Sequence, residues 1–161
     1  MNNLNPNAAG YAHKLRVRVC GICIKNNKLL LVQHQQTVNN TAFWAPPGGG
    51  LNYGESIKDC LKREFLEETR LEIDVSRFLF LNEFMEEPLH AVEMFFEVRT
   101  KGERVATGFD PELPPDNQLI EHVQYLTLDE IRKIERQNKH HILHHLFSLD
   151  DLLGLDNNFL P

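Results

Sequence analysis

The stretch PPGGGLNYGESIKDCLKREFLEETRL, Pro46–Leu71, places a glycine-rich segment directly before a half-apolar helical pattern that carries many carboxylates. On a helical wheel, three apolar residues form the stripe expected to face the core: Ile57, Leu61 and Phe65. Glu64 and Glu68 fall on the same side of the wheel, and Glu67 flanks it. Like charges three and four residues apart weaken an isolated helix, so something must offset the cost of these glutamates.

Two interpretations of this acidic helix are open. A buried carboxylate without a partner costs several kcal/mol, and neighbouring carboxylates raise one another's pKa unless a cation holds them. Hard divalent cations such as Mg²⁺ bind oxygen ligands, and the helical spacing lets Glu64, Glu67 and Glu68 reach one point. The alternative is a solvated acidic face paired with nearby basic residues. The preceding glycines favour the metal interpretation, because they let the backbone approach a ligand closely, as polyphosphate chemistry requires.

The charged residues resemble a known pattern, the box of the Nudix hydrolases, GX5EX7REUXEEXGU, in which U is apolar. The match runs from Gly49 through Glu55, Arg63-Glu64 and Glu67-Glu68 to Leu71. It departs from the box at the second glycine, where this chain has Arg70, a residue that costs about 1 kcal/mol if it ends the helix in a left-handed conformation. By this resemblance the protein is an α/β protein, a Nudix-like α/β/α sandwich with a mixed β-sheet.

The resemblance also implies roles for individual residues. The residues implied in catalysis are Glu64, Glu67, Arg63 and Glu55. The implied ligands of Mg²⁺ or Mn²⁺ are the Gly48 carbonyl, with Gly49 as its alternative, and Glu64, Glu67, Glu68 and Glu121. The residues expected at the substrate are Gly49, Gly50 and Tyr53. Arg63 is expected to position carboxylates, Glu55 to pair with Arg63 or orient the turn, and the general base stays open.

The function expected from the resemblance is a divalent-metal-dependent hydrolase that cleaves the pyrophosphate linkage of a nucleoside diphosphate joined to another group. ADP-ribose-like compounds, nucleotide sugars, nucleoside triphosphates and dinucleoside polyphosphates all stay open as substrates. The alternative is a nucleotide-sensing Nudix-like module without catalysis. Isomerase chemistry on an isoprenoid diphosphate needs a catalytic cysteine, which none of the three cysteines matches.

Composition sets the remaining expectations. At 161 residues the chain fits one domain, expected over residues 14–155, with a flexible tail at 1–13 and a short tail at 156–161. A net charge of −6 argues against nucleic acid or an anionic membrane as a partner, so a small-molecule nucleotide is expected. No apolar run is long enough to cross a membrane. Few cysteines indicate a reducing, cytoplasmic setting, and a homodimer is left open.

Local patterns predict a set of helices, strands and turns. The predicted strands are Lys14–Ile24, Leu29–His34, Ala42–Ala45, Glu72–Val75, Phe78–Phe84, His90–Thr100 and Glu121–Leu126. The predicted helices are Ser56–Thr69, Thr127–Asn138 and His140–Leu153. A turn is expected at Gly48–Gly50 and a proline-rich loop at Gly108–Gln118.

Two further motifs each allow a functional and a structural interpretation. In the run HHILHH, His140–His145, pairs of histidines have metal-ligand spacing on a helix, but a partly exposed amphipathic helix is favoured. Cys20 and Cys23 have redox or zinc spacing, but they are favoured as small apolar residues of a strand.

The neighbouring aromatics Phe43 and Trp44 are able to stack on a nucleobase. Packing against the sheet is the favoured interpretation for Trp44.

Overall fold

The computed structural model describes residues 10–35, 42–102, 104–109 and 118–154. Most of the tail predicted at 1–13, the tail at 156–161 and most of the loop Gly108–Gln118 lie outside these residues, so the domain limits 14–155 stay a prediction. Among the described residues, no helix is long and apolar enough to cross a membrane.

Two sheets form the centre of the molecule. The strands of the first sheet, in spatial order, are β5 (Gly48–Gly50), β1 (Leu15–Ile22), β7 (Leu89–Thr100) and β6 (Ile73–Glu86). The second sheet consists of β2 (Ile24–Lys25), β3 (Lys28–Gln35) and β4 (Ala42–Ala45), with β8 (Ile120–Leu126) paired to β3. Strands β1 and β7 are parallel and the other pairs are antiparallel. The predicted mixed β-sheet is therefore confirmed.

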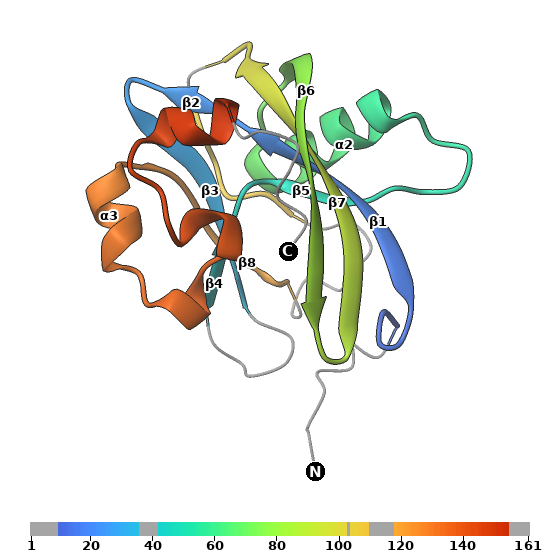
Figure 1. Cartoon of the computed structure of the whole chain (residues 1–161). Coiled ribbons are helices and arrows are strands. Elements are labelled where there is room, and N and C mark those ends of the chain that lie inside the picture. The colour runs from blue at the N-terminus through green and yellow to red at the C-terminus, as the bar shows by residue number, and fades with distance from the viewer. Residues whose placement is uncertain (1–9, 36–41, 103, 110–117, 155–161) are drawn as a thin grey trace.

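Helical segments cover the strands on both sides (Figure 1). Helix α2 (Ile57–Thr69) lies on one side. The C-terminal segments lie on the other: α3 (Leu128–Lys133) and the 3₁₀ helices η2 (Arg136–Asn138), η3 (His141–Leu143) and η4 (Leu149–Leu153). The predicted α/β/α arrangement is confirmed.

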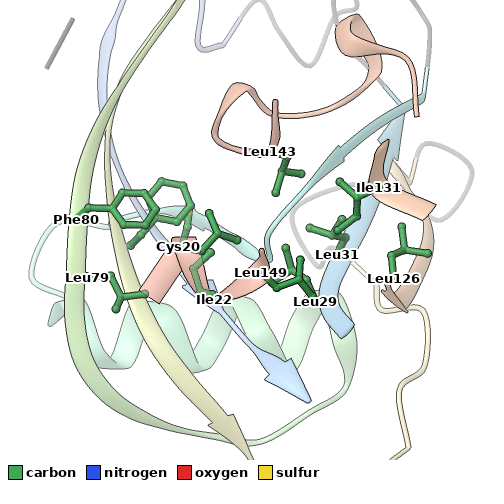
Figure 2. Close-up of a cluster of buried hydrophobic side chains, with 12 residues drawn as sticks. Cys20, Ile22, Leu29, Leu31, Leu79, Phe80, Leu126, Ile131, Leu143 and Leu149 are labelled. Carbon is green, nitrogen blue, oxygen red and sulfur yellow. The ribbon is translucent and has the colours of Figure 1, made fainter. Parts of the chain in front are cut away.

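Each side of the strands has its own apolar core. Leu29 and Leu31 of β3 face the core under the C-terminal segments, whereas Leu30 faces the core under α2. Figure 2 shows the first of these cores, in which side chains from both sheets and from the C-terminal segments point toward one another. Because both faces of β3 are covered, its sequence is continuously apolar rather than alternating.

The two cysteines of the C-x-x-C motif face opposite sides of the strands, as neighbouring residues of β3 do. Cys20 and Cys23 are buried and free, and they lie in different cores. Their interpretation as small apolar residues is confirmed, and so is that of Trp44, which packs against the core under the C-terminal segments.

Helix α2 begins and ends as its sequence predicts. The Ser56 side chain accepts a hydrogen bond from the backbone N–H of Asp59, which caps the first turn. Arg70 ends the helix in the left-handed conformation, at φ 60°, and its N–H donates to the Leu66 carbonyl. Ile57 differs from the prediction: it is 37% exposed, because the apolar stripe meets the sheet only from the second turn onward.

Three predictions in the sheets are wrong. The strand predicted over Lys14–Ile24 is interrupted at Cys23 and divided into β1 and β2, which belong to different sheets. Gly48–Gly50 forms an edge strand on β1 rather than a turn. A Cβ on Gly48 would overlap the Val19 carbonyl, so glycine permits this close pairing. The two strands predicted between Glu72 and Phe84 are one strand, β6, because two register shifts absorb the irregular residues near Arg77.

The predicted C-terminal helices are also wrong in extent. Helix α3 ends at Lys133, because Ile134 adopts an extended conformation. Lys139 then pairs with Trp44 in an isolated bridge, which holds the chain extended directly before the predicted helix His140–Leu153. Two short 3₁₀ helices replace that helix. The histidine pairs at i, i+4 therefore do not share a helical face.

Candidate active site

A cavity of about 970 Å³ lies where β1, β5 and α2 meet. Nearly all of the predicted site residues line it: Gly48, Gly49, Gly50, Tyr53, Glu55, Arg63, Glu64, Glu67 and Glu68. Glu121 differs: it is exposed on β8 and does not line this cavity, so its metal-binding role stays a prediction without structural support.

Arg63 is the centre of the acidic cluster. Its guanidinium binds both carboxylate oxygens of Glu55, at 2.7 Å from Nε and 3.0 Å from Nη2. Its Nη1 donates to Glu64 Oε1 at 2.8 Å and to Glu67 Oε2 at 3.2 Å, and Nη2 donates to the Gly50 carbonyl at 3.2 Å. One cation thus offsets the repulsion among three carboxylates. The hydrogen bond from Arg63 lowers the pKa of Glu55 to about 2.

Glu64 lies directly against the glycine strand. A Cβ built on Gly49 would overlap the carboxylate of Glu64, so only glycine leaves room for that carboxylate. Burial raises the pKa of Glu64, and the nearby charge and hydrogen bond of Arg63 oppose this shift. The carboxylate is therefore held in a partly desolvated position between α2 and β5.

Glu68 is the most buried of these carboxylates, with 6% of its surface exposed. Its Oε2 accepts a hydrogen bond from the Gly48 N–H at 2.9 Å, and its Oε1 lies 3.5 Å from His34 Nε2. Burial lowers the pKa of His34 to about 4, so this imidazole is neutral at neutral pH. The contact of Glu68 with His34 is therefore not an ion pair at that pH.

The chemistry of these side chains fits a hard divalent cation, because the available ligands are oxygens. Glu64 and Glu67 already share one positively charged donor, Arg63 Nη1. Within the residues that the structure describes, no three acidic, histidine or cysteine side chains are already gathered at metal-binding distance. The Gly48 carbonyl, a predicted ligand, accepts a hydrogen bond from Arg18 Nη2 at 3.1 Å.

A polar row across the first sheet was not predicted from the sequence. Arg18 of β1 stands beside Gly50 of β5 and Glu93 of β7, and Glu93 stands beside Asn82 of β6. Arg16 and Arg18 also line the cavity. The alternating stretch LRVRV, which places both arginines on one face of a strand, is the signal that could have found them.

Glu93 is fully buried, and several groups neutralise it. Its Oε2 accepts hydrogen bonds from His140 Nε2 at 2.8 Å and from Asn82 Nδ2 at 3.0 Å, and Arg18 lies 3.4 Å from its Oε1. Burial alone would raise the pKa of Glu93, but the hydrogen bond and charge of His140, with help from Arg18 and Asn82, lower it to about 2. His140 therefore acts as a partner of a buried carboxylate.

A sandwich that gathers a glycine-rich strand and a carboxylate-bearing helix around one cavity defines the class of Nudix domains. The model of the NUDIX domain family matches residues 14–146, and the chain belongs to this family. The predicted family, and with it the enzyme class of pyrophosphohydrolases, is confirmed. Nudix hydrolases generally use divalent metal ions, and the family implies a small-molecule nucleotide substrate.

Solved structures support the same fold. A MutT NUDIX hydrolase from Burkholderia pseudomallei is 17% identical, covers 81% of this chain and 95% of its own, and has a TM-score of 0.63. A NUDIX hydrolase from Nitrosomonas europaea is 24% identical over 74% of this chain and 76% of its own, with a TM-score of 0.59. An ADP-ribose pyrophosphatase from Streptococcus suis 89-1591 is 24% identical over 71% of this chain and 75% of its own, with a TM-score of 0.52.

Proposed function

We propose that this protein is a divalent-metal-dependent hydrolase that cleaves the pyrophosphate linkage of a nucleoside diphosphate joined to another moiety. The observation that carries the proposal is the convergence of Glu64, Glu67 and Glu68 with the strand Gly48–Gly50 around one cavity. ADP-ribose and nucleotide sugars are the favoured substrates. A structural relative described as an ADP-ribose pyrophosphatase supports that choice.

Glu64, Glu67 and Glu68 would hold Mg²⁺ or Mn²⁺, which, when bound, would neutralise pyrophosphate charge and make water more acidic. Arg63 keeps Glu64 and Glu67 facing the cavity, and Glu55 fixes the orientation of Arg63. In the hydrolysis, a water oxygen forms a bond to one phosphorus and the bridging P–O bond on that phosphorus breaks. The proton of the water passes to a carboxylate of the cluster, for which Glu64 and Glu67 are the candidates.

The test is a panel of ADP-ribose, UDP-glucose, ATP and a dinucleoside polyphosphate, incubated with Mg²⁺, with Mn²⁺, or with EDTA, and analysed by mass. We expect metal-dependent release of two phosphorylated products from at least one compound. Glu64→Gln should lower turnover by at least about a hundredfold, because it removes a metal ligand or base. Glu72→Gln, at an exposed glutamate just after α2, is the matched control and should keep full turnover.

Two outcomes would contradict the proposal. The first is undiminished turnover in Glu64→Gln with the fold intact. The second is nucleotide binding without any product on prolonged incubation with metal, which would support the alternative of a sensing module.

A further inference from the structure

A second cavity, of about 450 Å³, adjoins the one over the glutamates. The two cavities share Phe43, Phe84 and Glu86 as lining residues. The size of the second cavity is within the range of small-molecule sites. The reaction proposed above does not account for it, because the glutamates of α2 line only the first cavity.

The surface between the two cavities is aromatic. Phe84 of β6 stacks on His140 and His141, with ring centroids 5.6 Å and 5.9 Å away and interplanar angles of 29° and 11°. Phe43 of β4 meets His140 edge-on, with ring centroids 6.4 Å apart. We call these four residues the aromatic wall. Planar rings that already pack in parallel offer a surface on which another planar ring stacks well.

Hydrogen bonds hold the imidazoles of the aromatic wall in place. His140 Nε2 donates to the buried Glu93, and His141 Nε2 donates to Asn82 Oδ1 at 2.7 Å. Burial lowers the pKa of His141 to about 4, so its ring is uncharged at neutral pH. The wall is therefore pre-organised, which lowers the conformational entropy that its side chains would lose when a ligand binds.

Polar groups surround the second cavity at its C-terminal side. Gln137 and Asn138 of η2 line it together with Glu86, and the charged residues Glu135, Arg136 and Lys139 line it as well. Amides provide both donors and acceptors, and a carboxylate provides acceptors only. Such groups around an aromatic surface match the edge of a base that carries an amino group.

We propose that the second cavity is the subsite for the nucleobase of the substrate, with an amino-bearing base such as adenine stacked on the aromatic wall. The subsite rests on the proposed function, since the phosphates then lie toward the glutamates of α2. Cationic side chains line both cavities, Arg16, Arg18 and Arg63 in the first and Arg136 and Lys139 in the second, so this direction rests on the glutamates of α2. The wall also gives two histidines of HHILHH, the buried His140 and the exposed His141, a role other than metal binding.

The experiment compares AMP with ribose 5-phosphate, which lacks the base, by isothermal titration calorimetry with the full chain in EDTA. Stacking on an aromatic side chain contributes about 1–3 kcal/mol per base, so AMP should bind at least about tenfold more tightly than ribose 5-phosphate. Phe84→Leu should remove most of this preference. Phe78→Leu is the matched control, because Phe78 lies on the same strand but is outside both cavities. Thermal melting checks that each variant is folded, and Phe43→Leu replaces Phe84→Leu if the latter does not fold.

Equal binding of AMP and ribose 5-phosphate, or no AMP binding by the folded protein, would overturn the subsite. So would an AMP preference that survives in the folded Phe84→Leu variant, or in Phe43→Leu where that variant replaces it. The binding test is independent of catalysis. Hydrolysis of a nucleoside diphosphate compound without an AMP preference would keep the proposed function and reject the subsite. An AMP preference without hydrolysis would keep the subsite and reject the proposed function.

Discussion

Replacing Gly49 with alanine tests whether the position of the Glu64 carboxylate controls activity. The added Cβ would overlap that carboxylate, and the atoms it meets are the far end of a flexible side chain. The backbone can therefore stay in place while the carboxylate moves by about 1 Å to recover ordinary contact distances. That movement would also disturb the 2.8 Å hydrogen bond between Arg63 and Glu64.

The expected effects on activity and on stability differ in size. A displacement of about 1 Å in an active site costs roughly a hundredfold in rate, or about 2.7 kcal/mol of transition-state stabilisation. The cost in folding stability is smaller. A strained side-chain rotamer costs about 0.5–1.5 kcal/mol, and the lower entropy of the unfolded chain with alanine returns about 0.4–1 kcal/mol. We expect kcat/KM to fall about a hundredfold, while the free energy of unfolding changes by less than about 1 kcal/mol.

The assay measures hydrolysis of the best substrate of the panel with Mg²⁺, alongside urea unfolding of the same samples. Gly102→Ala is the matched control, because Gly102 lies outside both cavities and a Cβ there meets only Leu71 Cδ2, at 3.9 Å. This substitution should leave activity nearly unchanged. Equal activity of Gly49→Ala and the wild type would refute the reasoning, and so would equal losses in both alanine variants.

Two further predictions concern stability. Arg70→Gly should raise the free energy of unfolding by about 0.5–1 kcal/mol, because it relieves the left-handed strain at φ 60° at some cost in chain entropy; an unchanged or lower melting temperature would contradict this. For Glu93, the folded-state pKa of about 2 is below its usual value of 4.5. Its ionised form therefore contributes about 3 kcal/mol to the free energy of unfolding above pH 4.5, and this contribution is lost as the pH falls through 2. In Glu93→Gln, the loss of stability between pH 5 and pH 2, measured by urea unfolding, should be smaller by about that amount; an equal loss would show that Glu93 is not responsible.

The parts predicted correctly from sequence are those that local signals determine. The start of α2 depends on Ser56 and Asp59, which are three residues apart, and its buried side depends on the spacing of Leu61 and Phe65. The charged residues of the box lie close together in sequence, because they belong to α2 and to the segment directly before it. A single pattern therefore placed the lining that comes from α2 and the glycine strand, but not the lining from β1, β3, β4 and β6.

The parts missed depend on contacts between distant residues. A run of glycines has little preference for strands, and Gly48–Gly50 becomes a strand only because β1 pairs with it. The histidine run has helical spacing, but the bridge between Trp44 and Lys139 and the burial of His140 against Glu93 override it. No local pattern contains such information.

The ion pairs of Arg63 explain how α2 holds several carboxylates close together without exposing them to solvent. A solvated acidic face would leave its carboxylates exposed, yet Glu68 is buried and the side chains of Glu55 and Glu64 are less than 20% exposed. Arg63 supplies one positive charge to three of these carboxylates, so the cluster keeps a negative excess. A partly buried site that retains unbalanced negative charge is unfavourable for folding and favourable for a divalent cation. The helix is therefore better explained as a binding site held together by Arg63 than as a surface selected for stability.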